Sequence, residues 1–169
     1  MAFRHHNTSA GTQCLIVVSF TLSILACQFQ TIRHSSLKAA LDTNQFLKAL
    51  YFDEDFAEAL RLAGEQLRQS VTADTLKKMV DEIGRERGRL KNLRADSYLM
   101  TQGQSMELFY IGEYETGVLY HRLVLIGDAS SGYKVTGVWF QPDPYPTNSL
   151  RRKFDADIFV MAPTPPASQ

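Results

Sequence analysis

His121 is the side chain in this sequence best suited to acid–base chemistry. An imidazole ordinarily titrates close to neutral pH, so a histidine in a cavity can act as a general base or contact a ligand. Strand alternation places His121 on one sheet face with Tyr110, Gly112 and Tyr114, and Trp139 joins them from the next strand. These five residues are the candidate pocket. The alternative is a core histidine hydrogen-bonded to a tyrosine hydroxyl.

The pairing behind this pocket depends on the turn of a predicted hairpin. If residues 116–117 form a two-residue loop, Gly112 lies opposite His121 and leaves room there for a pocket floor. A five-residue loop over 128–132 would then bring Trp139 beside His121. A register slip of one residue would reverse the faces.

Carboxylates and metal ligands are poorly placed for catalysis. Glu113 and Glu115 fall on the opposite face from the candidate pocket, so no catalytic dyad is predicted. After residue 27, the histidines are His34 and His121, and neither has ligand spacing with other metal-binding side chains. We therefore expect no catalytic residues, no metal and no cofactor.

The opposite sheet face has the composition of an interface. Phe109, Ile111, Tyr120 and Val124 alternate there with charged residues, which makes the face too apolar to remain fully in water. Three alternatives remain for what packs on this face: the C-terminal segment, a second copy of the chain in a homodimer, or a protein partner. These four residues are the candidate interface.

Net charge argues against nucleic acid as a partner. The 169 residues carry 18 basic and 18 acidic side chains, so the chain lacks the positive surface that phosphate binding needs. The hydrophobic fraction of 44% is typical of a globular protein rather than a disordered one.

Residues 1–26 have the organisation of a signal peptide, with Arg4 before an uncharged stretch over 14–26. The motif Ile24-Leu25-Ala26-Cys27 resembles the bacterial lipobox, which implies lipidation of Cys27 and attachment to a membrane. The residue after it, Gln28, resembles the pattern for outer-membrane sorting in a Gram-negative cell. We expect an exported, lipid-anchored protein of the bacterial cell envelope. Cleavage without lipid, an uncleaved anchor and a buried core element are the alternatives.

The remaining chain reads as helices followed by strands, the order of an α+β fold. Helical spacing predicts helices over 37–51, 56–67 and 72–83, the last with Thr72 as N-cap and a glycine near its end. Runs rich in β-branched and aromatic residues predict antiparallel strands over 91–101, 106–115, 118–127 and 133–141.

The expected domain organisation follows from these elements. A linker over 27–36 leads to an α+β domain over 37–142, and a C-terminal extension over 143–169 ends in a disordered tail. Within the extension, residues 149–161 are compatible with a fifth, peripheral strand or with a surface segment.

Four stretches carry a family resemblance: DFAEAL on a helix, GRLKNL, GEYETG, and GYKVTGVWFQP. Over residues 40–142 their order resembles small exported bacterial domains of unknown function with a cystatin-like, nuclear-transport-factor-like cone. The resemblance implies a curved four-stranded antiparallel sheet packed on N-terminal helices. It also implies frequent dimers and, in some members, a pocket between helices and sheet, but no catalytic residues to transfer.

Two function classes remain from the sequence. The first is a non-enzymatic envelope lipoprotein module that binds a protein partner or a small ligand through the sheet face or the cone pocket. The second is a cone-pocket enzyme of isomerase or dehydratase type that uses His121 with nearby tyrosines, an expectation that rests on analogy of fold.

Overall fold

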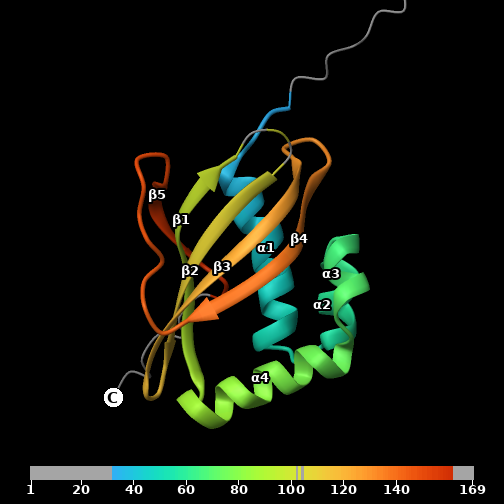
Figure 1. The fold of residues 1–169 in the computed structure, drawn as a ribbon, viewed down its shortest axis with the longest axis vertical. Coiled ribbons are helices and arrows are strands. Elements are labelled where there is room, and N and C mark those ends of the chain that lie inside the picture. Colours follow the sequence, from blue (N-terminus) through green and yellow to red (C-terminus); the bar gives the residue numbers. More distant parts are fainter. Residues whose placement is uncertain (1–31, 102, 104, 162–169) are drawn as a thin grey trace, which may run out of the picture. The chain divides into compact units, whose positions relative to one another are not determined.

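The computed structural model describes residues 32–101, 103 and 105–161. Four helices come first: α1 (Ser36–Tyr51), α2 (Phe56–Leu62), α3 (Glu65–Ser70) and α4 (Ala73–Arg87) (Figure 1). Five strands follow: β1 (Leu90–Met100), β2 (Ser105–Tyr114), β3 (Gly117–Asp128), β4 (Gly132–Gln141) and β5 (Arg152–Phe159). The predicted signal peptide, Cys27, the first half of the linker and the C-terminal tail lie outside the described residues.

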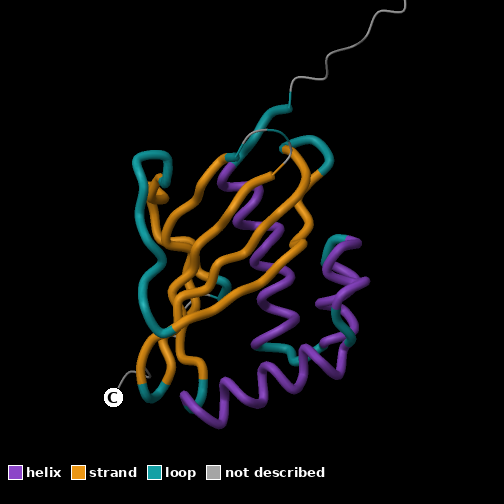
Figure 2. Tube along the Cα trace, viewed as in Figure 1, coloured by secondary structure: helices purple, strands orange, loops and turns teal. Residues whose placement is uncertain are grey.

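The strands form one antiparallel sheet in the order β4-β3-β2-β1-β5. Helix α1 crosses behind the sheet, α2 and α3 lie beside β4, and α4 runs past one end of the strands (Figure 2). The α+β class is confirmed, with five strands in the sheet instead of the predicted four. One sheet face therefore packs on helices, and the other is the outer face referred to below.

Polar caps fix where the helices begin. The hydroxyl of Ser35 accepts a hydrogen bond from the Lys38 amide at 3.2 Å and so starts α1. Thr72 does the same for α4 through the Thr75 amide at 3.2 Å, as predicted. Such caps satisfy amide groups that have no partner within the helix. Helix α4 ends at Arg87 and is followed by Gly88, whose φ of 76° is a conformation that residues with a side chain disfavour.

The predicted helix over 56–67 is wrong, because the chain breaks it into α2 and α3. The amide of Gly64 leaves the helical pattern and donates to the Val135 carbonyl of β4 at 2.8 Å. A Cβ atom at Gly64 would lie 2.8 Å from Thr136 Cγ2, so glycine is needed for this close approach. Helical spacing alone could not reveal a hydrogen bond to a distant strand.

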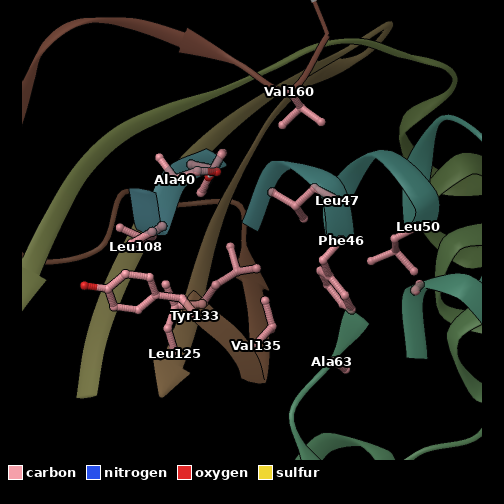
Figure 3. Packing of buried hydrophobic residues seen from close by; sticks show 14 of the residues in the cluster. Ala40, Phe46, Leu47, Leu50, Ala63, Leu108, Leu125, Tyr133, Val135 and Val160 are labelled. Carbon is pink, nitrogen blue, oxygen red and sulfur yellow. The ribbon is translucent and has the colours of Figure 1, made fainter. Parts of the chain in front are cut away.

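The hydrophobic core lies between α1 and the helix-facing side of the sheet. Phe46, Leu47 and Leu50 of α1 belong to the same buried cluster as Leu108 and Leu125 of β2 and β3 (Figure 3), and each is at most 1% exposed. Burying a side chain of this size contributes about 1.5–3 kcal/mol. This packing holds the sheet face that carries His121 against the helices.

The β2–β3 hairpin differs from its predicted register by two residues. Tyr114 pairs with Gly117, so the turn consists of residues 115–116 instead of 116–117. Opposite His121 lies Tyr110 rather than Gly112. A shift of two residues is one full period of side-chain alternation, so the predicted assignment of side chains to the two faces still holds.

A bulge in the β3–β4 pairing moves Trp139 to the other face of the sheet. The register shifts between Val124 and Leu125, after which Trp139 lies opposite Arg122 and Phe140 lies opposite His121. The predicted placement of Trp139 beside His121 is therefore wrong. An extra residue on one strand shifts the side-chain alternation by one position, so every side chain beyond it points to the opposite face of the sheet.

The chain beyond residue 142, where we expected the domain to end, is part of the fold. Strand β5 pairs with β1, so the segment left undecided from sequence contains a fifth strand. Val160 follows it, is 9% exposed, and belongs to the core cluster. The Asn44 amide also donates to the Phe159 carbonyl at 2.9 Å. These contacts attach the segment to both sheet and helix.

Candidate functional site

His121 lies on β3 and is fully buried. Its Nδ1 atom is 3.4 Å from the hydroxyl of Tyr51 at the end of α1, and its Nε2 atom has no hydrogen-bond partner among the described residues. Burial lowers the pKa of His121 to about 4, so the imidazole is neutral at neutral pH. This arrangement matches the alternative of a core histidine bonded to a tyrosine.

Gly112 does leave room for His121, although the two residues are not paired. A Cβ atom at Gly112 would lie 3.0 Å from His121 Nε2 and 3.0 Å from Tyr114 Cε2. The imidazole and the tyrosine ring therefore occupy the space that the missing side chain frees. Gly112 accommodates the packed histidine and does not form the open floor that the sequence led us to expect.

The two tyrosines of β2 are buried in different surroundings. The Tyr110 hydroxyl donates to Asn44 Oδ1 at 2.8 Å, within the main core. Tyr114 packs against Ile83 and Leu119, and its hydroxyl has no hydrogen-bond partner among the described residues. Burial raises the pKa of Tyr114, as it does for Tyr110. The structure thus brings four predicted pocket residues together and separates Trp139 from them.

A pocket of about 590 Å³ opens on the far side of Tyr51 and Tyr114. It lies between the end of α1, the second half of α4 and the start of β1. Apolar side chains of Phe52, Ile83 and Leu90 contribute to its lining together with the two tyrosines. His121 lies behind this wall, so the ligand-sized space differs from the one predicted.

Sequence reasoning missed Tyr51, which is the last residue of the predicted helix over 37–51. Its ring meets His121 edge-on, with centroids 5.5 Å apart. The two residues are 70 positions apart in the chain. A tyrosine at the last position of a helix was the available signal, but spacing within the helix names no contact on a distant strand.

The outer face carries an aromatic and charged cluster made of Trp139, Arg122 and Glu107. The Arg122 guanidinium lies 5.4 Å from the centroid of the Trp139 ring, and it donates two hydrogen bonds of 2.8 Å to Glu107. These bonds raise the pKa of Arg122, which stays charged. Phe109 lies opposite Arg122 in the β2–β3 pairing, so Glu107, two residues away on the same face, is a diagonal neighbour of the arginine.

Gly137 determines where the Trp139 ring lies. A Cβ atom at Gly137 would overlap Cη2 of Trp139, so the indole covers the bare backbone of this residue. Trp139 nevertheless remains 49% exposed. The indole is thus held against glycine on one side and faces solvent on the other.

The candidate interface residues are only partly available. Phe109 is 6% exposed because Tyr145 and the Arg151 guanidinium cover its ring, at 5.7 Å and 3.7 Å between centres. Ile111, Tyr120 and Val124 are half-buried. The C-terminal segment is therefore one of the three expected covers, but it covers only part of the outer face.

Arg151 attaches this segment to the sheet. Its guanidinium donates to the Ser97 hydroxyl at 2.7 Å and to the Tyr145 carbonyl at 2.9 Å, and it lies 3.3 Å from an Asp96 oxygen. Lys153 also bonds Asp96 at 2.7 Å. Burial opposes ionisation of Asp96, but the bonds from Lys153 and Ser97 outweigh it and lower the pKa of this carboxyl.

Within the described ranges, no three or more His, Cys, Asp or Glu side chains are grouped so that they could hold a metal ion. None of the helices in that part of the chain has the length and apolar composition required to span a bilayer. In comparisons with known proteins, no family model, no curated protein and no solved structure matches the chain.

Proposed function

We propose that this chain is an exported, lipid-anchored module of the bacterial envelope that binds a protein through the outer face of its sheet and catalyses no reaction. The observation that carries the proposal is the cluster of Trp139, Arg122 and Glu107. Tryptophan, tyrosine and arginine are the residues that most often dominate the energy of protein interfaces. Here an exposed indole and a guanidinium lie side by side.

The cluster is also held in place before any partner binds. Glu107 fixes the Arg122 guanidinium with two hydrogen bonds, and Gly137 gives the indole a backbone surface to lie on. Side chains that are already ordered lose less conformational entropy on binding. Tyr120 and Val124 extend the same face with partly exposed apolar surface.

The surroundings of His121 support a binding role over catalysis. A general base must reach the proton that it abstracts and needs a pKa near the working pH. His121 has no exposed surface, and its pKa is lowered by burial, with no carboxylate contributing. The hypothesis of an enzyme based on this residue therefore gains no support from its geometry.

A site-specific cross-linker tests the binding proposal. A benzophenone amino acid at Tyr120 should give one discrete adduct in intact cells, and adding Trp139→Ala or Arg122→Ala should remove it. The same cross-linker at Gln69, exposed on α3, is the matched control and should give no such adduct. The mass of the adduct distinguishes a second copy of the chain from a different envelope protein.

Two results would contradict the binding proposal. One is an adduct of equal yield from Tyr120 and Gln69, and the other is an adduct at Tyr120 that persists when Trp139 is replaced by alanine. Either would mean that the outer face makes only nonspecific contacts.

The anchor has its own test, because Cys27 lies outside the described residues. Mass spectrometry of the mature protein from native membranes should find an N-terminal Cys27 carrying acyl chains. Cys27→Ser should release the protein from the membrane fraction, since several chains on one residue give stable anchoring. An intact Met1 or an unmodified Gln28 at the N-terminus would refute lipidation.

A further inference from the structure

We infer that the pocket between α1, α4 and β1 binds a short zwitterionic peptide that carries an apolar side chain. This site is separate from the outer face of the sheet and goes beyond the proposed function. Its volume of about 590 Å³ falls within the range of sites for small molecules.

The wall of the pocket contains an unused hydrogen-bonding group. Tyr114 is 5% exposed, and its buried hydroxyl has no partner among the described residues. A buried polar group without a partner is unusual in a folded protein and calls for a ligand, water or ion to satisfy it. Peptide amides and carbonyls can supply such a bond. The apolar rings of Tyr51 and Phe52 line the same space and suit an apolar side chain.

Side chains of opposite charge line the pocket. Glu54 acts electrostatically on Lys77 in the first half of α4, and the Lys77 ammonium group bonds Asp81, another lining residue, at 2.9 Å. Arg89 and Lys91 line the pocket beyond the C-terminal end of α4, so the acidic and basic residues lie toward opposite ends of this helix. Over the described part of the chain, Glu54, Arg89 and Lys91 make no ion pair with another side chain. Their charges are therefore free to pair with a ligand.

The pocket limits the length of the ligand. Its lining along α4 and the residue that follows runs from Val80 to Gly88, about 12 Å at a rise of about 1.5 Å per residue. An extended chain advances about 3.3 Å per residue, so a peptide of about three residues fits within this length. We place the peptide ammonium group near Glu54 and the carboxylate near Arg89 and Lys91, in keeping with the preference of charged groups for opposite partners.

The backbone of Glu54 is consistent with a role in binding. Its φ of 50° lies in the left-handed region, and among the described residues other than glycine it alone has a positive φ. Glycine or asparagine would adopt this conformation at lower cost. Strained residues of this kind concentrate at binding sites, and Glu54 is one of the residues that line the pocket.

Titration calorimetry with the tripeptide Ala-Phe-Ala and the full chain tests the inference. We expect saturable one-to-one binding that weakens by about tenfold when the peptide is N-acetylated and again when it is C-amidated, because each cap removes one charged contact. Tyr114→Phe should weaken binding by about fivefold through loss of one neutral hydrogen bond. It should not lower the melting temperature, since the hydroxyl has no partner to lose.

Matched variants locate the charged contacts. Arg89→Ala should weaken Ala-Phe-Ala but leave the affinity for its C-amidated form unchanged. Arg85→Ala is the control, because this arginine is exposed on α4 and paired with Glu82 instead of lining the pocket. Glu54→Gln should weaken Ala-Phe-Ala and not its N-acetylated form.

Trp139 is the single tryptophan and lies on the outer face, so its fluorescence should stay constant during the titration. Absence of binding would overturn the inference, as would equal affinity for the capped and free peptides. A change in Trp139 emission on binding would also overturn it by placing the peptide on the outer face. None of these results depends on whether the Tyr120 cross-link forms.

Discussion

Arg151→Ala should destabilise the fold more than its position near the C-terminus suggests. The side chains of Arg151 and Asp96 are 10% and 9% exposed, so the substitution breaks a buried ion pair. It also removes the bond to the Ser97 hydroxyl and the bond to the Tyr145 carbonyl, and it uncovers the ring of Phe109.

The magnitude follows from what remains after the substitution. Breaking a buried pair by removing one partner typically costs about 3–5 kcal/mol. Lys153 still bonds Asp96 at 2.7 Å, so the carboxylate keeps one cationic partner and the cost falls to about 2–3 kcal/mol. For a folded unit of this size, that corresponds to a melting temperature lower by about 10 °C.

Urea unfolding followed by circular dichroism measures this difference. Arg152→Ala is the neighbouring control: Arg152 is exposed and makes no ion pair within the described residues, so we expect a change within about 0.5 kcal/mol. If Arg151→Ala also changed the free energy of unfolding by less than about 0.5 kcal/mol, the reasoning about the buried pair would be refuted.

Three further predictions concern buried and crowded positions. Burial lowers the pKa of His121 in the folded state to about 4, so its stabilising contribution of about 3 kcal/mol is present above pH 6.5 and is lost as the pH falls from there toward 4. His121→Leu should remove this dependence of the free energy of unfolding on pH, which acid-unfolding curves measure. Gly137→Ala should displace the Trp139 ring, which shifts its emission to longer wavelength and abolishes the Tyr120 cross-link, whereas unchanged emission would contradict the contact. Gly64→Ala should lower the free energy of unfolding by about 1–3 kcal/mol because its Cβ would overlap Thr136, and an unaltered urea midpoint would show that the loop relaxes freely.

Much of the fold could be predicted because its signals are local. Each of the strands β1 to β4 begins and ends within one residue of the prediction, since β-branched and aromatic runs separated by turn residues are a property of the chain itself. The N-cap of α4 was equally accessible. Thr72 carries its hydroxyl to an amide three residues away, so no distant contact is involved.

The candidate site was predicted less completely, since its members meet across long sequence separations. Alternation placed Tyr114 and His121 on one face, and that assignment survived the two-residue change of register. Alternation could not identify Tyr51 as the partner of His121. Nor could it predict that the imidazole of His121 would occupy the space beside Gly112, where we expected a cavity.

The sequence by itself determined α1, the start of α4, the first four strands and the division of the β2–β3 hairpin into two faces, because each depends on residues within a few positions of one another. Tertiary structure alone decided the position of Trp139, the break at Gly64 and the attachment of β5. Trp139 changes face because one strand accommodates an extra residue against its neighbour. Gly64 and β5 use backbone hydrogen bonds to distant strands. Because backbone amide and carbonyl groups hardly differ from one residue to the next, the pattern of side chains along the sequence does not indicate which of these groups pair.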